Sequence, residues 1–311
     1  MNDIAIQVSG LGRVFGDMWA VRGLDLEVRR GEIFGLVGPD GAGKTTTMRM
    51  LTGILAASEG SASVAEFSIQ GDEEAIKSRI SYMSQRFGLY GDLSVEENLR
   101  FYADLYQVPR REREPLEERL LGFSNLTPFR KRQARNLSGG MKQKLGLACA
   151  LIHKPEILFL DEPTNGVDPV SRRDFWRILY AMLKEGVTIF VSTAYLDEAE
   201  RCTRVGLMHR GHLIQCDTPQ KLKEGIPGLL LELETEHPRV AREALAGQLG
   251  WNRISLFGGK LHLYAGDEAE VEQARTVLQE AGIAVLAEKT ITPTLEDVFI
   301  YQVSQEPEEE A

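Results

Sequence analysis

The chain has 311 residues and a formal net charge of −10. This length suits a large domain followed by a small one, and the negative charge disfavours nucleic acid as a partner because phosphate binding needs a basic face. The N-terminus lacks the pattern of a secretion signal, and no apolar run approaches the roughly 20 residues that span a bilayer. The cysteines lack CxxC spacing, which indicates buried thiols in a reducing cytosolic compartment; they are Cys149, Cys202 and Cys216.

The first 220 or so residues alternate apolar strands with amphipathic helices, a pattern that predicts a parallel sheet with helices on its faces. Residues 86–156 are predicted to be mostly helical, and a Pro/Gly-rich stretch near 224 indicates a boundary that ends a first domain, 1–224. Nearly continuous apolar runs are typical of buried parallel strands. We expect such strands at 32–38, 156–161 and 187–192.

A second domain is predicted over 225–303, because strand and helix patterns follow one another in the βαββαβ order of ferredoxin-like folds. A last short helix is expected at 294–303, and the acidic tail 304–311 is expected to be disordered. The five earlier segments of this domain are a strand at 229–234, a helix at 238–250, a hairpin at 253–266, a helix at 268–282 and a strand at 283–289.

The stretch GPDGAGKTT at 38–46 fits the phosphate-loop pattern G-x-x-x-x-G-K-[ST], between a predicted strand and a predicted helix. Its glycines allow successive backbone N–H groups to face one anion, and the helix start adds partial positive charge. Lys44 is expected to reach the β- and γ-phosphates, and the Thr45 hydroxyl to hold Mg²⁺. The alternative is a chance match in a glycine-rich chain. The residues predicted to bind ATP here are Gly38, Pro39, Asp40, Gly41, Ala42, Gly43, Lys44, Thr45 and Thr46.

Two further stretches are candidate phosphate-site elements. Asp161 and Glu162 end an apolar strand, where one carboxylate can hold Mg²⁺ and the next can polarise a water molecule. The alternative is an ordinary acidic surface turn. Ser138, Gly139 and Gly140 precede a predicted helix, so this stretch is either a second anion-binding helix start or a plain capped helix.

Together these motifs resemble the ATPase subunit of an ABC transporter: GPDGAGKTT, then Gln85 in YMSQRFGLY, LSGGMKQK, ILFLDEP and TNGVDP, in matching order and spacing over about 220 residues. The closing PTLEDVFI resembles the accessory domain of drug-exporter-type ATPases. The resemblance implies an α/β fold, with a P-loop NTPase core of RecA type that carries a helical subdomain at about 86–156, plus a small ferredoxin-like α+β domain that regulates or dimerises the ATPases.

The resemblance also implies a head-to-tail dimer with two ATP molecules at its interface, so that the partners are a membrane permease and a second ATPase domain. The resemblance further implies that Lys44 and Thr45 bind phosphate and Mg²⁺, and that Asp161 is the second Mg²⁺ ligand. Gln85 then senses Mg²⁺ and the attacking water, and Glu162 is the general base. Ser138, Gly139 and Gly140 would contact the partner's γ-phosphate, Asp168 would lie in the loop that crosses the dimer, and Phe15 would stack on adenine or simply pack in the core.

Ala194, in STAYLDEAE after the strand at 187–192, departs from the family pattern, which usually has a histidine there that contacts the γ-phosphate. Alanine offers no donor or acceptor, and Tyr195 is an imperfect substitute because adjacent side chains near a strand end tend to face opposite ways. We expect a site that binds ATP and hydrolyses it slowly. The chain would then pair with a histidine-bearing ATPase, or it would form a homodimer that tolerates the loss.

The function favoured by the sequence is a transport ATPase on the inner face of the cell membrane, which powers export through a separate permease. Residues 85–98 are where such ATPases contact the permease, unless this segment is only a subdomain hinge. A soluble ABC-type ATPase acting on ribosomes or DNA is less compatible with one ATPase domain and net negative charge. A nearly inactive regulatory subunit is favoured by Ala194 and disfavoured by Glu162.

Overall fold

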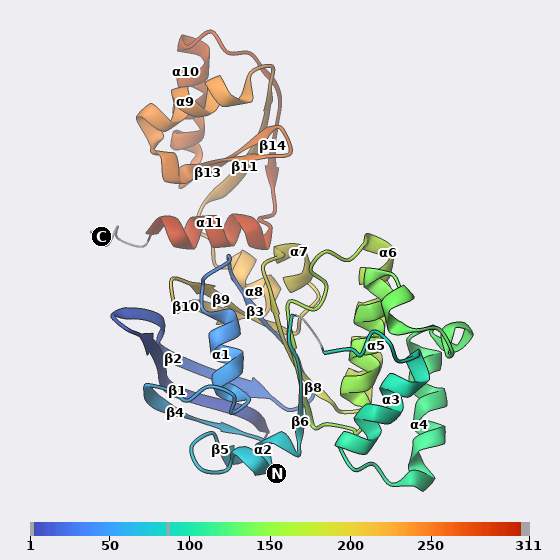
Figure 1. Ribbon diagram of the computed structural model, residues 1–311. Coiled ribbons are helices and arrows are strands. Elements are labelled where there is room, and N and C mark those ends of the chain that lie inside the picture. Colours follow the sequence, from blue (N-terminus) through green and yellow to red (C-terminus); the bar gives the residue numbers. More distant parts are fainter. Residues whose placement is uncertain (1–2, 86–87, 306–311) are drawn as a thin grey trace. The chain divides into compact units, whose positions relative to one another are not determined.

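The computed structural model describes residues 3–85 and 88–305, and the chain divides into two compact units, Met1–Cys216 and Asp217–Ala311 (Figure 1). The boundary predicted near 224 lies after the one in the structure, which follows Cys216. The short helix α8 (Pro219–Glu224) belongs to the second unit, because it contacts the last helix of that unit, α11 (Leu295–Gln305). This last helix includes residues 304 and 305, which were predicted to begin the tail; the rest of the tail lies outside the described residues.

A six-stranded sheet, in the order β10-β9-β3-β8-β7-β6, positions the candidate site of the first unit. Its five strands from β9 to β6 are parallel. Every residue of the three central strands is buried, which confirms the buried parallel strands expected from their apolar runs. The strands are β3 (Ile33–Val37), β6 (Ile80–Met83), β7 (Ile157–Asp161), β8 (Thr188–Thr193), β9 (Arg204–His209) and β10 (His212–Asp217).

A second sheet of the first unit is antiparallel, in the order β2-β1-β4-β5, and the prediction of a parallel sheet alone missed it. Its two long strands alternate buried and exposed residues, as expected for a sheet with one solvated face. Helix α1 (Lys44–Leu51) contacts strands of both sheets, so one apolar core forms around it. The strands are β1 (Ile4–Phe15), β2 (Met18–Arg29), β4 (Glu59–Val64) and β5 (Phe67–Ser68).

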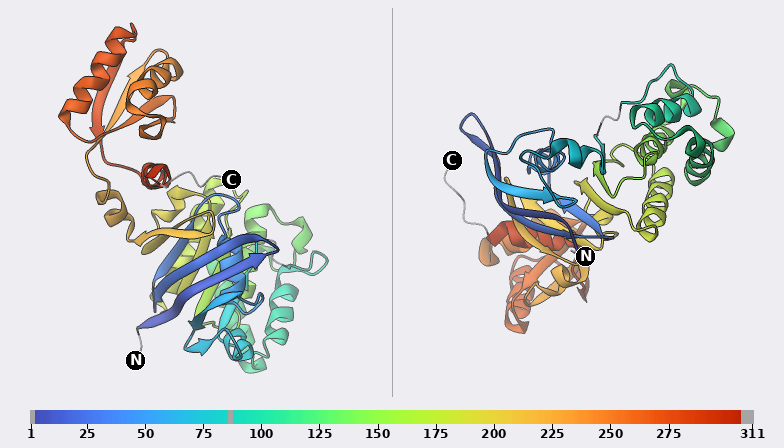
Figure 2. Two further views of the ribbon diagram at one scale, coloured as in Figure 1. Left: turned by 90° about the vertical axis from the view of Figure 1, so that its left-hand side faces the viewer. Right: turned by 90° about the horizontal axis from the view of Figure 1, so that it is seen from below.

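The segment at 86–156 is mostly helical in its described part, and its helices α3, α4 and α5 pack against one another (Figure 2). Helix α3 starts at a capping box in which Ser94 and Glu97 satisfy each other's backbone N–H groups. The remaining helices of the first unit flank the parallel sheet. The helices are α2 (Glu73–Lys77), α3 (Val95–Leu105), α4 (Arg110–Phe123), α5 (Gly139–Leu151), α6 (Pro169–Lys184) and α7 (Leu196–Ala199), with 3₁₀ turns at Thr127–Phe129 and Ala134–Asn136.

The second unit has the predicted βαββαβ order, and its antiparallel sheet β12-β13-β11-β14 has the ferredoxin-like strand order. Helices α9 and α10 contribute to a core shared with the sheet, so this unit buries apolar side chains of its own. The elements are β11 (Leu229–Thr235), α9 (Pro238–Leu249), a 3₁₀ turn (Trp251–Arg253), β12 (Ile254–Phe257), β13 (Lys260–Ala265), α10 (Glu268–Glu280) and β14 (Val285–Ile291).

None of the three cysteines forms a disulfide in the described part of the chain, and their burial differs. Cys149 and Cys202 are buried, and burial raises the pKa of both thiols, which therefore stay protonated. Cys216 is only partly buried, contrary to the expectation of a buried thiol. Across 3–85 and 88–305, no helix combines the length and apolar character needed to cross a membrane.

Candidate functional site

The phosphate loop connects β3 to α1, as the motif requires, and glycines allow its tight path. Gly43 is the N-cap of α1 at φ 103°, and a β-carbon there would lie 2.4 Å from the Ala20 carbonyl oxygen. A β-carbon on Gly38 would lie 2.0 Å from the carbonyl oxygen of Met208. The loop backbone can therefore approach neighbouring strands only where side chains are absent, which leaves the first turn of α1 facing the site.

We expect Gly38→Ala to destabilise the first unit, because the Met208 carbonyl is backbone and cannot rotate away. Overpacking of this kind lowers the free energy of unfolding by about 1–3 kcal/mol. Gly122→Ala is the matched control, since Gly122 lies in α4 with open space at its β-carbon and alanine stabilises a helix interior by about 0.5–1 kcal/mol. Thermal denaturation monitored by circular dichroism measures both changes. Equal melting temperatures for the two variants would contradict the close approach at Gly38.

Lys44 points its ammonium group into the loop it belongs to. Its Nζ donates to the carbonyl oxygens of Gly38 at 2.7 Å and Pro39 at 3.0 Å, and it lies 3.3 Å from Glu162 Oε1. The lysine side chain is 4% exposed, so this charge is held in a low-dielectric position beside the helix start. The Lys44 ammonium is therefore placed where it can bind an anionic ligand.

Asp161 ends β7 opposite the loop and is buried among hydroxyl donors. Its Oδ1 accepts from Thr45 Oγ1 at 3.0 Å and from Ser192 Oγ at 2.7 Å, and its Oδ2 accepts from the Tyr82 hydroxyl at 3.1 Å. Burial, followed by the nearby Asp161 carboxylate, raises the pKa of Tyr82 to about 12, so the phenol remains a donor. A hydroxyl and a carboxylate oxygen thus meet at the loop, as a hard cation requires.

Glu162 adopts a left-handed backbone conformation, with φ 46°, that is uncommon outside glycine. Its N–H donates to Ser192, at 3.2 Å to the carbonyl and 3.1 Å to the hydroxyl, which holds the strained turn in place. Its Oε2 accepts from Gln85 Nε2 at 3.0 Å and from Asn165 Nδ2 at 3.3 Å. Its carboxylate is therefore aimed at Lys44 and Gln85 rather than at solvent.

Lys44, Thr45 and Glu162 line one cavity of about 530 Å³, large enough for the phosphates of a nucleotide. Gln85 and Glu162 line it together with the loop. Phe15 is 46% exposed at the end of β1, with the Arg13 guanidinium 4.7 Å from its ring centre. Core packing is therefore excluded for Phe15, whereas adenine stacking stays a prediction. The cavity is lined by Ala20, Asp40, Gly41, Ala42, Gly43, Lys44, Thr45, Thr46, Gln85, Glu162 and Asn165.

A second cavity, of about 280 Å³, adjoins the first at Asp40, Glu162 and Asn165. Ala194 and Tyr195 line it together with Glu162, so the position predicted to depart from the family pattern lies beside the candidate base. The Tyr195 hydroxyl donates to Asn165 Oδ1 at 3.3 Å. The strand β8 runs between β3 and β7, so its end necessarily faces the gap between the phosphate loop and the acidic pair.

The serine–glycine stretch lies at the start of α5. Ser138 is the N-cap, and its hydroxyl accepts from the Met141 N–H at 3.3 Å. Gly140 packs so closely on α6 that a β-carbon would lie 2.3 Å from Ser171 Oγ. Asp168 caps α6 by accepting from the N–H groups of its first turn, and these hydrogen bonds lower the pKa of the carboxyl group. Neither Ser138 nor its two glycines are among the described residues that line the phosphate cavity.

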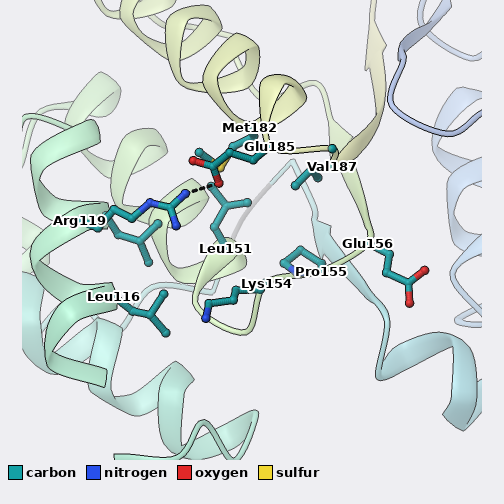
Figure 3. A pocket seen from close by; sticks show the side chains of 11 residues that line it. Leu116, Arg119, Leu151, Lys154, Pro155, Glu156, Met182, Glu185 and Val187 are labelled. Atoms are coloured by element: carbon teal, nitrogen blue, oxygen red, sulfur yellow. Dashed lines mark ion pairs between the residues drawn. The ribbon is translucent and has the colours of Figure 1, made fainter. Parts of the chain in front are cut away.

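A further cavity, of about 320 Å³, lies away from all of these residues (Figure 3). Its wall combines leucine side chains of α4 and α5 with the end of α6. An ion pair joins Arg119 to Glu185 in this wall, and Lys154 lies 3.8 Å from Glu112. Its charged side chains thus already have ion-pair partners, and the cavity is a weaker candidate than the phosphate loop.

Sequence reasoning missed the residues that hold the acidic pair in place: Tyr82, Ser192 and Asn165. Ser192 stands in the quoted strand just before Ala194, and Asn165 stands in TNGVDP, so both were within motifs already singled out. Their role depends on contacts with residues 30 and 3 positions away, and that of Tyr82 on a contact 79 positions away. The alternation of apolar and polar residues and the spacing of motif residues within one segment do not reveal such contacts.

A sequence model of the ABC transporter family matches residues 21–165. The chain is 43% identical over 305 residues to the probable multidrug ABC transporter ATP-binding protein YbhF of Escherichia coli, covering 96% of this chain and 52% of YbhF. The chain thus spans about half the length of that relative. It is 35% identical to the Nod factor export ATP-binding protein I of Rhizobium etli, over 98% of this chain and 95% of the relative.

Solved structures of the same kind share the fold. One of them is cbiO1 of Clostridium perfringens, described as part of the ABC transporter complex cbiONQ, with a TM-score of 0.67 and 25% identity. The alignment covers 80% of this chain and 96% of cbiO1. With the phosphate loop, the acidic strand end and the serine–glycine helix start in place, the chain belongs to the ATP-binding proteins of ABC transporters, which are ATPases.

Proposed function

We propose that this chain binds and hydrolyses ATP to drive export through a separate membrane permease, at the cytoplasmic face of the membrane. The observation that carries the proposal is the single cavity in which the phosphate loop faces Gln85 and Glu162. Export is supported by the relatives, whose names refer to multidrug transport and to Nod factor export. Substrate specificity belongs to the permease. We therefore expect ATP hydrolysis by this chain to drive transport of every substrate that the permease accepts.

The donor set fits a magnesium ion. Thr45 Oγ1 and Asp161 Oδ1 lie 3.0 Å apart beside the cavity, and Gln85 adds an amide oxygen. Hydroxyl, carboxylate and amide oxygens are the ligands that hard divalent cations prefer. Magnesium bound there would neutralise the charge that develops on the phosphates.

Lys44 and Glu162 exchange partners when ATP binds, in the mechanism we propose. The ammonium of Lys44 lies 3.3 Å from Glu162 Oε1. The β- and γ-phosphates compete for this ammonium, which releases the Glu162 carboxylate to accept a proton from the attacking water. Gln85 and Asn165 still donate to Glu162 and keep it in position.

A second ATPase domain completes the site. Ser138, Gly139 and Gly140 form a capped helix start, yet among the described residues they do not line the phosphate cavity of their own chain. A helix start favours an anion, and in a head-to-tail dimer it would contact the partner's γ-phosphate. ATP then joins two chains, and loss of the cleaved phosphate lets them separate.

An asymmetric pair of ATPases is supported by Ala194. The cavity that it lines beside Glu162 is about 280 Å³, and a methyl group cannot donate to a phosphate in it. The phosphate loop fits the pattern G-x-x-x-x-G-K-[ST], and Ser138, Gly139 and Gly140 are all present. The chain can therefore complete a partner's site while its own site turns over slowly.

The permease partner is tested by isolating the tagged chain from detergent-solubilised membranes of its own host. We expect a protein with several membrane-spanning helices to copurify, and its reconstitution in liposomes to stimulate ATP hydrolysis by the chain. Recovery of the chain free of any such protein, with ribosomes or DNA instead, would contradict export and favour a soluble ATPase. The wild-type chain incubated with detergent alone is the control.

The second unit is proposed to regulate or dimerise the ATPase. It has its own apolar core, so it can fold separately. Because the structure divides the chain after Cys216, a shortened chain should end there rather than at the boundary predicted near 224. Light scattering and steady-state turnover of the shortened chain, with ATP, test this role; unchanged dimerisation and turnover would contradict it.

A further inference from the structure

We propose that Tyr195 positions the candidate base Glu162 through the side chain of Asn165, an inference that rests on the proposed hydrolysis of ATP at Glu162. The Tyr195 hydroxyl donates to Asn165 Oδ1 at 3.3 Å, and Asn165 Nδ2 donates to Glu162 Oε2 at 3.3 Å. An amide is suited to this place because it accepts from a phenol at one atom and donates to a carboxylate at the other. The direction of both hydrogen bonds fixes which way the amide faces.

Tyr195 is held firmly although its side chain is 38% exposed. Its backbone N–H donates to Thr193 Oγ1 at 3.0 Å, and the Arg172 guanidinium lies 4.7 Å from its ring centre. Arg172 is anchored in turn by an ion pair of 3.1 Å with the fully buried Glu198. The ring therefore has little freedom to leave Asn165, and its hydroxyl is presented in a defined position.

Such support matters most when ATP is bound. Glu162 is also held by Lys44, but that ammonium is needed by the phosphates in the proposed mechanism. Gln85 and Asn165 then remain as the donors to Glu162 Oε2. Ala194 lines the same cavity and contributes no polar group. Tyr195 thus supplies an indirect contact with the base, whereas the histidine expected from the family pattern would supply a direct contact with phosphate.

The kinetic test is a double-mutant cycle on the full chain. Tyr195→Phe keeps the ring and removes only the hydroxyl; we expect kcat for ATP to fall about fivefold, the equivalent of one net hydrogen bond, with KM changed less than twofold. In an Asn165→Ala background, Tyr195→Phe should have no further effect, because the two residues act in series. Tyr180→Phe is the matched control: Tyr180 is 37% exposed and its hydroxyl donates to the Arg201 carbonyl, away from the cavity.

A spectroscopic test needs no nucleotide. The side-chain amide ¹H–¹⁵N signals of Asn165 should shift in Tyr195→Phe and in Glu162→Gln, and should stay unchanged in Tyr180→Phe. A merely structural role for Tyr195 would instead shift backbone signals of α7 and leave the Asn165 amide in place. Unchanged Asn165 signals in Tyr195→Phe would overturn the proposal.

The kinetic outcomes separate this inference from the proposed function. An equal loss of kcat from Tyr195→Phe in both backgrounds would overturn the role through Asn165, as would a Tyr195→Phe variant as active as Tyr180→Phe. If Glu162→Gln abolishes turnover while Tyr195→Phe is silent, hydrolysis at Glu162 stands and only the positioning role fails. If Glu162→Gln retains turnover, the proposed base is wrong and both ideas fall.

Discussion

Replacing the candidate base, Glu162→Gln, is expected to reduce ATP turnover by about 10²–10⁴-fold, the contribution typical of a positioned general base. Glutamine fills the same space, and its amide can still contact Gln85 and Asn165. Lys44 remains bonded to the carbonyls of Gly38 and Pro39, so the loop should keep its shape. Phosphate release in single-turnover conditions measures the loss, and binding of a fluorescent ATP analogue should be within about threefold of the original affinity, below one net hydrogen bond.

The same variant should accumulate as an ATP-bound dimer, because binding continues while the step that opens the dimer is blocked. Size-exclusion chromatography with and without ATP reports this change. Glu280→Gln, at an exposed position of α10 in the second unit, is the control with the same chemical change. Turnover within tenfold of the original for Glu162→Gln would show that another group accepts the proton.

Restoring a histidine, Ala194→His, is expected to raise turnover of the isolated chain by about 10²–10³-fold, the effect typical of one preorganised contact to a transition-state phosphate. Ala194 is exposed and borders a cavity of about 280 Å³, so an imidazole can enter without displacing the core. Binding of ATP should change little, since the loop backbone and Lys44 are untouched. Steady-state phosphate release by the purified chain measures the gain.

Ala194→Phe provides the matched control, because it adds a ring to the same cavity without a donor. We expect it to leave turnover low, which would assign any gain in Ala194→His to the imidazole nitrogens. Ordinary transporter rates in the unmodified chain, unchanged by Ala194→His, would contradict the asymmetric pair. A homodimer that tolerates alanine would then be the better description.

Several parts of the fold could be predicted because their signals are local. Buried parallel strands show as short apolar runs, and the βαββαβ order of the second unit shows in alternating periods of two and 3.6 residues. The antiparallel sheet was missed, since β1 and β2 have the alternation of any half-buried strand and the pairing of β1 with β4 joins residues far apart in the chain. The unit boundary was placed late because α8 follows the first domain in sequence but packs on α11.

The candidate site divides in the same way. Residues 38–46 and the Asp161–Glu162 pair could be found from spacing, because backbone N–H groups and strand-end carboxylates need particular residues at adjacent positions. The supports of that pair, Tyr82, Ser192 and Asn165, could not be found, and neither could the exposure of Phe15. The sequence alone also could not decide whether the helix start at Ser138 contacts the phosphate loop of the same chain.

The sequence by itself determined a phosphate-loop pattern and an acidic strand end, and its resemblance to ABC transporter ATPases predicted a histidine position that Ala194 occupies. Only the tertiary structure decided that Ala194 borders the cavity beside Glu162, and that Tyr195 reaches the same carboxylate through Asn165. The reason is physical: a motif is a property of neighbours along the chain, whereas a catalytic geometry depends on strand order. Here β8 lies between β3 and β7, which brings three separate segments to one edge of the sheet.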